Sequence, residues 1–216
     1  AAVEGLGGGL RLTDTHANLS ANTILQNQAL SSSTGSGAGG GVYANRTDLT
    51  MLNSVVAANH ASTHGAGIYF TSSDQYIYKP GNLLHNTIAD NTGCGEGVYA
   101  YTWTDLALTN SIISGHSSYG VYAGTAYSNI DLDGTLWYQN SADSGGSGVI
   151  TRLHDYTGDP AYTAPLTGSY HLAGASAALD KGVGVQVDVD MDGQLRPNGS
   201  GLDLGADEYY ASSGPA

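Results

Sequence analysis

A run of alternating carboxylates near the end of the sequence has the spacing of a cation-binding loop. The run is Asp188-Val189-Asp190-Met191-Asp192-Gly193. Carboxylates that alternate on a tight turn can converge on a hard cation, and glycine permits the turn. The twelfth position, which holds glutamate in an EF-hand, is Gly199 here, so the run is not an EF-hand. We predict a calcium site with the ligands Asp188, Asp190, Asp192, Asp203 and Asp207, and Glu208 as a further candidate. The alternative is an acidic turn held by Arg196 and hydrogen bonds.

A second candidate site is a row of tyrosines at one position of a repeated phrase. Each tyrosine follows a glycine and an apolar residue, as in Gly41-Val42-Tyr43. If the apolar residue points into a core, the tyrosine next to it on a strand points outward. An exposed aromatic row suits sugar rings or a protein partner, whereas the alternative is that the rings only stabilise the sheet. The row is Tyr43, Tyr69, Tyr99 and Tyr122, and the inward residues are Val42, Ile68, Val98 and Val121.

The groups that a polysaccharide-cleaving enzyme needs are sparse. Elimination from a uronic polymer requires cationic side chains and a base, and hydrolysis of a glycosidic bond requires two carboxylates at a defined separation. The best carboxylate pair is Asp131 and Asp133, two apart on an expected strand. We therefore expect a protein that is not an enzyme, and we keep a polysaccharide lyase or hydrolase as a third hypothesis. The cations of the first 154 residues are scattered: Arg11, Arg46, Lys79 and Arg152.

Several smaller features have a modest interpretation. His60 and His64 lie four apart on an expected turn, which favours surface histidines over a metal site. Cys94 stands alone, so we expect a small filler in a glycine-rich corner, with an intermolecular disulfide as the alternative. Three glycosylation-type triplets begin at Asn18, Asn45 and Asn198, although such matches arise readily in a chain rich in Asn, Ser and Thr.

The elements that position these residues repeat along the chain. The apolar residue of the glycine phrase recurs at 10, 42, 68, 98, 121 and 149, an irregular period that indicates a repeat architecture. The units lack a helical apolar stripe and instead contain short alternating runs between glycine-rich turns. We therefore predict an all-β fold, a right-handed parallel β-helix (a solenoid) of about five to six coils.

Asparagines recur beside the expected strands and suit the corners between them. Asparagine tolerates the left-handed conformation, and its amide can bond to the amide of the next coil. We expect two sets of ladders, one preceding a strand (Asn22, Asn53, Asn86, Asn110) and one following it (Asn27, Asn59, Asn91, Asn140).

Charge excludes some partners. Six basic and nineteen acidic residues give a net charge of −13, which disfavours nucleic acids and anionic membranes as partners. No apolar stretch is long enough to span a membrane, so we expect no membrane insertion. No signal peptide is visible at Ala1, and the sequence resembles a mature or trimmed form.

The last third has a different composition and a family resemblance. Nine of the nineteen acidic residues and four of the five prolines lie from Asp155 onward. Five segments in order, 159–162, 168–172, 176–182, 190–197 and 203–209, resemble the C-terminal segment of bacterial surface β-helix proteins with a choice-of-anchor Q type domain. The resemblance implies an exported, extracellular or cell-surface protein with a structural or adhesive role, and it brings no catalytic residues. The sequence shows no anchor segment before Ala216.

These features divide the chain into coils at 1–154 and a C-terminal cap at 155–216. We expect the cap to cover the last coil with Leu172, Ala177, Leu179, Val187, Leu202, Leu204 and Ala206. The first coil begins near Gly7, with little sequence before it to cover its end. An uncovered end is a template for another chain, so we expect self-assembly, with filaments as one form that such end-to-end contacts can produce. The leading hypothesis is a non-catalytic structural or adhesive protein; the second is a carbohydrate-binding module that uses the tyrosine row.

Overall fold

The protein is built from β-strands that pair almost entirely in parallel. The computed structural model describes residues 4–32, 36–74, 79–184 and 187–211. Among the strands described there, only β21 (Tyr162–Ala164) and β22 (Ser169–Leu172) pair antiparallel, and the single helical turn is η1 (Pro165–Thr167). The expected class, all-β with parallel sheets, is confirmed.

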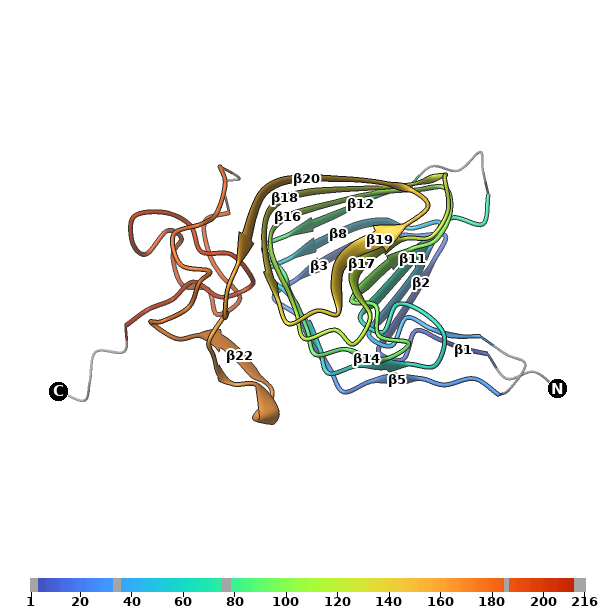
Figure 1. Cartoon of the computed structure of the whole chain (residues 1–216), viewed down its shortest axis with the longest axis horizontal. Coiled ribbons are helices and arrows are strands. Elements are labelled where there is room, and N and C mark those ends of the chain that lie inside the picture. Colours follow the sequence, from blue (N-terminus) through green and yellow to red (C-terminus); the bar gives the residue numbers. More distant parts are fainter. Residues whose placement is uncertain (1–3, 33–35, 75–78, 185–186, 212–216) are drawn as a thin grey trace.

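One sheet collects the glycine-apolar-tyrosine phrases of successive units (Figure 1). Its register pairs Leu10 with Val42, Val42 with Ile68, Ile68 with Val98 and Val98 with Val121. The four inward residues from Val42 to Val121 have no exposed surface, so the predicted alternation is confirmed. The six strands, in spatial order, are β19 (Ala142–Gly146), β17 (Tyr119–Ala123), β15 (Val98–Ala100), β11 (Ile68–Thr71), β7 (Val42–Asn45) and β2 (Leu10–Thr13).

A nine-stranded sheet receives two strand segments from each unit, which we name the first arm and the second arm. The first arms are β3 (His16–Ser20), β8 (Asp48–Leu52), β12 (Lys79–Leu84) and the beginnings of β16 (Thr104–Ser114), β18 (Ser128–Tyr138) and β20 (Val149–Thr157). The second arms are β4 (Thr23–Leu25), β9 (Val55–Ala57), β13 (Thr87–Ala89) and the ends of the same three long strands. Both arms pair in parallel from one unit to the next.

Smaller sheets complete the units. A three-stranded parallel sheet contains β14 (Thr92–Gly93), β10 (His60–Ala61) and β5 (Gln28–Ala29), and a two-stranded one contains β1 (Gly5–Leu6) and β6 (Gly37–Ala38). The apolar core is enclosed by the six-stranded sheet and by both the first and the second arms, which bury Phe70, Leu83 and Ile113 respectively. Gly81 makes room there, because a Cβ on it would lie 2.4 Å from Leu106 Cδ1 and 3.1 Å from Phe70 Cζ.

A single left-handed residue turns each unit from the first arm into the second. The aligned residues share φ values of 47–69° but differ in type: Ala21, Asn53, His85, Asn110, Gly134 and His154. Our alignment of the first asparagine set was therefore wrong by one position. Asn53 and Asn110 occupy the corner, whereas Asn22 and Asn86 follow it, one on each side of Ser54 in the stack.

The second asparagine set forms the predicted ladder. Asn27 donates to Asn59 Oδ1 from its backbone N (2.9 Å) and Nδ2 (3.1 Å), and Asn59 bonds to Asn91 in the same way. The next position holds His116, which the sequence pattern did not reveal. Its ring lies 3.3 Å from Asn91 Nδ2 through Nε2 and 2.9 Å from Asn140 Oδ1 through Nδ1.

The sixth copy of the phrase lies earlier than expected. Val121 pairs with Ser144 rather than Val149, and Val149 instead pairs with Asn129 in the nine-stranded sheet. Val149 is 58% exposed. The predicted position of the sixth copy was wrong because the true copy, Ser144-Gly145-Gly146, has no apolar residue at the position of Val121.

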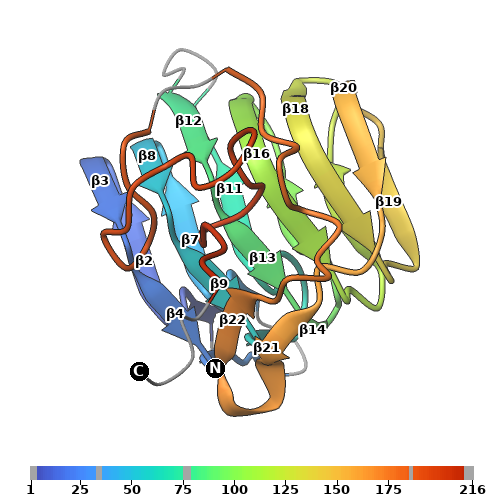
Figure 2. The ribbon, with the colours of Figure 1, turned by 90° about the vertical axis from the view of Figure 1, so that its left-hand side faces the viewer.

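The segment after β20 lies along the flank of the stack, outside the second arms (Figures 1 and 2). Leu172, Ala178 and Leu204 pack on Ile112 and Leu136, which point out of the sheet. Tyr170 and Ala206 pack on Val55, Ala57 and Ala89. We name residues 158–211 the flanking segment. It covers a side that spans several units, so the prediction that it covers the last unit was wrong. The expected boundary after residue 154 falls inside β20.

No helix in the described residues has the length and apolar character required to cross a membrane.

Candidate functional site

The tyrosine row is a continuous stack on the outer side of the six-stranded sheet. Successive ring centroids are 5.3, 5.4 and 5.3 Å apart from Tyr43 to Tyr69, Tyr99 and Tyr122, and neighbouring rings are tilted by no more than 13°. The Arg11 guanidinium continues the stack, 5.9 Å from the centre of the Tyr43 ring. In-register strands produce this geometry, because they bring the same position of each unit together.

The row is less exposed than expected. Tyr99 is only 6% exposed, and the rings of His64 and Tyr101 lie 4.4 and 6.1 Å from its ring. Burial raises the pKa of Tyr99 to about 12. Because the rings cover one another's faces, the row offers mainly ring edges, whereas a sugar ring stacks on a face. The geometry therefore favours the stabilising role over sugar binding at this row.

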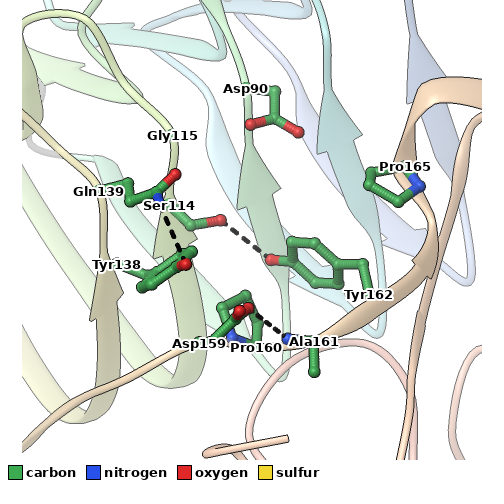
Figure 3. Close-up of a pocket in the computed structure, with 10 residues that line it drawn as sticks. All are labelled: Asp90, Ser114, Gly115, Tyr138, Gln139, Asp159, Pro160, Ala161, Tyr162 and Pro165. Atoms are coloured by element: carbon green, nitrogen blue, oxygen red, sulfur yellow. Dashed lines mark hydrogen bonds between the residues drawn. The ribbon is translucent and has the colours of Figure 1, made fainter.

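A cavity of about 260 Å³ lies where the second arms meet the flanking segment (Figure 3). The stack side comes from corners and strand ends of three successive units, and the other side comes from the chain between β20 and η1. The lining residues on the stack are Asp90, Ser114, Gly115, Tyr138 and Gln139, and those on the flanking segment are Asp159, Pro160, Ala161, Tyr162 and Pro165.

Hydrogen bonds fix most of the polar groups of this cavity (Figure 3). The hydroxyl groups of Tyr162 and Ser114 are 3.0 Å apart, and Gln139 Nε2 donates to the Tyr138 hydroxyl (3.0 Å). Asp159 Oδ1 accepts the backbone N–H of Ala161 (2.7 Å) and so shapes the loop. Aromatic rings beside fixed carboxylate, amide and hydroxyl groups can bind a polyhydroxylated ligand.

The charge of the cavity is acidic. Among the described residues that line it, Asp90 and Asp159 are the only carboxyl groups and none is cationic. Asp90 Oδ2 accepts the Tyr170 hydroxyl at 3.0 Å. Burial raises the pKa of Asp90, and this hydrogen bond partly offsets the rise. Carboxylates accept hydrogen bonds from neutral hydroxyl groups but repel acidic sugars.

Sequence reasoning did not identify this cavity. Asp90 occupies a left-handed corner, φ 54°, at a position that holds Gln26 and Ala58 in the preceding units. The one signal in the sequence was the carboxylate of Asp90 at a corner that holds uncharged residues in the preceding units. Tyr162 belongs to a segment that we noted for its family resemblance alone.

The five predicted calcium ligands do not converge on one point. Asp190 is 2% exposed, and its Oδ1 accepts the backbone N–H groups of Asp192 (2.9 Å) and Gln194 (2.8 Å). Asp203, also 2% exposed, accepts the N–H groups of Asp180 (2.7 Å) and Tyr209 (2.8 Å). Burial raises the pKa of Asp203 to about 6. These two carboxylates hold the loops of the flanking segment, as the acidic-turn interpretation expects.

The remaining three predicted ligands do not all lie together. Asp188 is exposed and lies outside any cluster of ligand groups among the described residues, whereas Asp192 and Asp207 lie together with His171. Arg196 and Glu208 form an ion pair, Nη1 to Oε2 2.8 Å, with both side chains fully buried. The Arg196 guanidinium also donates to Gly205 O (2.9 Å) and Ala206 O (2.8 Å), so it holds the chain at 203–208. Only its backbone N–H reaches the acidic run, where it donates to Asp188 O (2.9 Å).

The smaller candidates lie on the surface. Asn18 and Asn198 are exposed and Asn45 is partly exposed. Cys94 is exposed, so it does not pack as a small filler in its glycine-rich corner; its Sγ lies 3.0 Å from Ser62 O.

The paired candidates also lie at the surface. His64 is exposed and His60 partly exposed, and neither belongs to a metal-ligand group in the described chain. Asp131 and Asp133 are on one face of β18, and Asp133 bonds to His154 at 2.7 Å.

Comparison of the chain with family models, with curated proteins and with solved structures finds no match.

Proposed function

We propose that the protein is a right-handed parallel β-helix of about six coils that serves as a non-catalytic structural or adhesive component outside the cell. The register of the two large sheets carries this proposal, since equivalent positions of successive units pair in parallel. A stack of this kind extends a surface by adding units rather than by enlarging one core.

The buried asparagine ladder supports a rigid stack of units. Asn59 and Asn91 have no exposed surface, and Asn59 Nδ2 also donates to Ile24 O (2.9 Å). Buried amides that are fully hydrogen-bonded specify one register, because a slip of one residue leaves them without partners. A rigid stack of fixed register suits a spacer or surface component.

The edge of the first unit supports association of copies end to end. Within the described chain, β2, β3 and β4 each have a strand neighbour on one side only. A cavity of about 280 Å³ at this edge is lined by Gly9, Leu10, Asn22, Thr23, Ile24 and Asn27. Edge strands with unpaired backbone groups and apolar side chains accept a further strand, and a second copy can supply it.

Sedimentation velocity over a concentration series, combined with negative-stain imaging, tests this role. We expect reversible association that Leu10→Lys abolishes, because a charge would then lie in the buried junction. The control Leu166→Lys changes a side chain that is 96% exposed in η1 and should associate like the wild type. A monomer at every concentration would overturn the proposed self-association.

The cavity of Figure 3 favours a second candidate function, binding of a neutral sugar. Its carboxylates can accept hydrogen bonds from sugar hydroxyl groups, and its Gln139 amide can both accept and donate them. Tyr138 and Tyr162 line the cavity with aromatic surface. These features support sugar binding at the junction of the stack and the flanking segment in preference to the tyrosine row.

Titration with neutral and acidic oligosaccharides chosen from a glycan array tests sugar binding. We expect binding of a neutral sugar that Tyr138→Ala removes, whereas Tyr127→Ala, which changes a 55% exposed tyrosine outside the cavity, leaves it unchanged. Release of reducing ends or unsaturated products from the same sugars would instead establish the polysaccharide-cleaving hypothesis and contradict a non-catalytic role.

A further inference from the structure

Three metal-ligand side chains from separate parts of the flanking segment meet at one place. His171 lies on β22, Asp192 follows the buried Asp190, and Asp207 precedes the buried Glu208. One ligand atom of each side chain lies within 4.8 Å of the other two, and no other such group of three occurs in the described residues. The sequence spacing, 21 and 15 residues, carried no sign of this convergence.

Groups outside the cluster hold two of the three side chains in place. The Ser169 hydroxyl lies 2.9 Å from His171 Nδ1, and Thr163 Oγ1 lies 2.9 Å from the same hydroxyl. This contact directs the other ring nitrogen, Nε2, toward Asp192 Oδ2 at 2.8 Å. A metal-binding histidine usually has its second nitrogen held by such an outer partner.

Asp207 is buried and oriented. It is 4% exposed, and its Oδ2 accepts the backbone N–H of Leu172 at 2.7 Å. His171 and Asp192 remain open to solvent, with side chains 40% and 42% exposed. An ion could therefore enter from solvent past His171 and Asp192 and bind the fixed carboxylate of Asp207.

Two other histidine–aspartate pairs provide an internal comparison. His16 and Asp48 are 2.9 Å apart, and His154 and Asp133 are 2.7 Å apart. Neither pair belongs to a group of three ligands in the described chain. The pair of His171 and Asp192 therefore differs from an ordinary surface pair by its buried third ligand.

We propose that His171, Asp192 and Asp207 bind a divalent transition metal of the zinc class. One imidazole nitrogen and two carboxylate oxygens form a three-ligand set that zinc accepts, with water in the fourth position. Tetrahedral bonds of about 2.0–2.2 Å place ligand atoms roughly 3.5 Å apart, which small rotations of the two exposed side chains can achieve. Calcium prefers six to eight oxygen ligands, so the imidazole favours zinc over the calcium expected from the sequence.

The metal would cross-link the flanking segment. It would tie β22 to the loop at Asp192 and to the chain at Asp207, which together pack on the second arms through Tyr170, Leu172 and Ala206. Because an ion that binds only the folded state stabilises it by mass action, zinc should raise the melting temperature of the metal-free protein.

Calorimetric titration of the chelator-treated full chain with zinc chloride, and separately with calcium chloride, tests the site. We expect one zinc site per chain and weaker calcium binding. His171→Gln and Asp192→Asn should each weaken zinc binding by about 100-fold or more, and both change exposed groups, so the fold should persist. His154→Gln and Asp188→Asn are the matched controls and should bind zinc like the wild type.

Three results would overturn the assignment. Equal zinc binding by wild type and His171→Gln would place the metal on other surface histidines. Preferential calcium binding that is lost in Asp188→Asn would restore the calcium loop predicted from the sequence. No rise of the melting temperature with zinc, together with no heat of binding, would leave the three side chains as a hydrogen-bonded cluster only.

Discussion

His116 is the titratable member of the buried asparagine ladder, and its replacement by asparagine should change how the protein responds to acid. The ring is 1% exposed. Its Nδ1 lies 2.9 Å from Asn140 Oδ1, so Nδ1 carries the proton and Nε2 accepts from Asn91 Nδ2. A proton added to Nε2 would therefore face an amide N–H group and would be buried without a partner.

The magnitude follows from the pKa. Burial lowers the pKa of His116 from 6.5 to about 4, against an opposing effect of the Asn140 hydrogen bond. The folded protein then binds fewer protons than the unfolded chain between these values, so the free energy of unfolding falls as the pH falls through this window. At about 1.4 kcal/mol per pKa unit, the full effect is about 3 kcal/mol. About 2 kcal/mol of it is lost by about pH 5, which corresponds to about 4–8 °C in Tm for a chain of this size.

Urea unfolding of wild type and His116→Asn at about pH 7.5 and about pH 5 measures this difference. We expect the variant to lose about 2 kcal/mol less than the wild type between the two conditions, because asparagine continues the ladder without titrating. Leu166→Asn, which changes a 96% exposed side chain that does not titrate, should keep the wild-type pH dependence. Equal losses in wild type and His116→Asn would refute the ladder argument.

Two further substitutions test the packing. Arg196→Leu should lower the free energy of unfolding by about 3–5 kcal/mol, because Glu208 stays buried without its partner. The double variant Arg196→Leu/Glu208→Leu should lose less stability than the single variant. An equal loss in the two variants would contradict this explanation. Gly81→Val should cost about 1–3 kcal/mol by forcing a side chain against Leu106, as measured by chemical unfolding. Gly184→Ala, where a Cβ meets nothing within 4 Å, is the control and should stay within about 0.5 kcal/mol of wild type.

The sequence predicted those parts of the fold in which the equivalent position is buried in every unit. Val42, Ile68, Val98 and Val121 are all inward, and burial restricts such a position to apolar residues. The tyrosine row follows from the same register. The strand of the last unit in this sheet was not identified, because Ser144 replaces the apolar residue at this position.

The corners could not be identified by residue type. A left-handed φ is compatible with asparagine and glycine but also occurs here at Ala21, His85 and His154. The backbone N–H groups of Ala21 and His85 donate to Leu52 O (3.0 Å) and Thr109 O (2.9 Å) of the next unit, and these bonds do not depend on residue type. An asparagine alone therefore did not distinguish the corner at Asn53 from the following position at Asn86.

The position of the flanking segment depends on apolar residues that face away from the main core. Ile112 points out of the sheet beside the inward Ile113, and Leu136 points out beside the inward Trp137. In the sequence these pairs read as continuous apolar runs, which do not show that a second layer covers the outer side. The convergence of His171 with Asp192 and Asp207 depends on that layer, so the local sequence could not predict it either.

The stack and the flanking segment should respond to acid in opposite directions. Burial raises the pKa of Asp203 from 3.8 to about 6, so the folded protein binds more protons than the unfolded chain in that window. Its contribution to stability is present at low pH and is lost as the pH rises through about 6, whereas the contribution of His116 has the opposite sign. Hydrogen exchange at about pH 5 and about pH 7.5, corrected for intrinsic rates, separates the two. Amides beside Asp203 should be better protected at the lower pH, and amides beside His116 less protected. Parallel changes in both regions would show that they open only together, and the local assignment of these two groups would then fail.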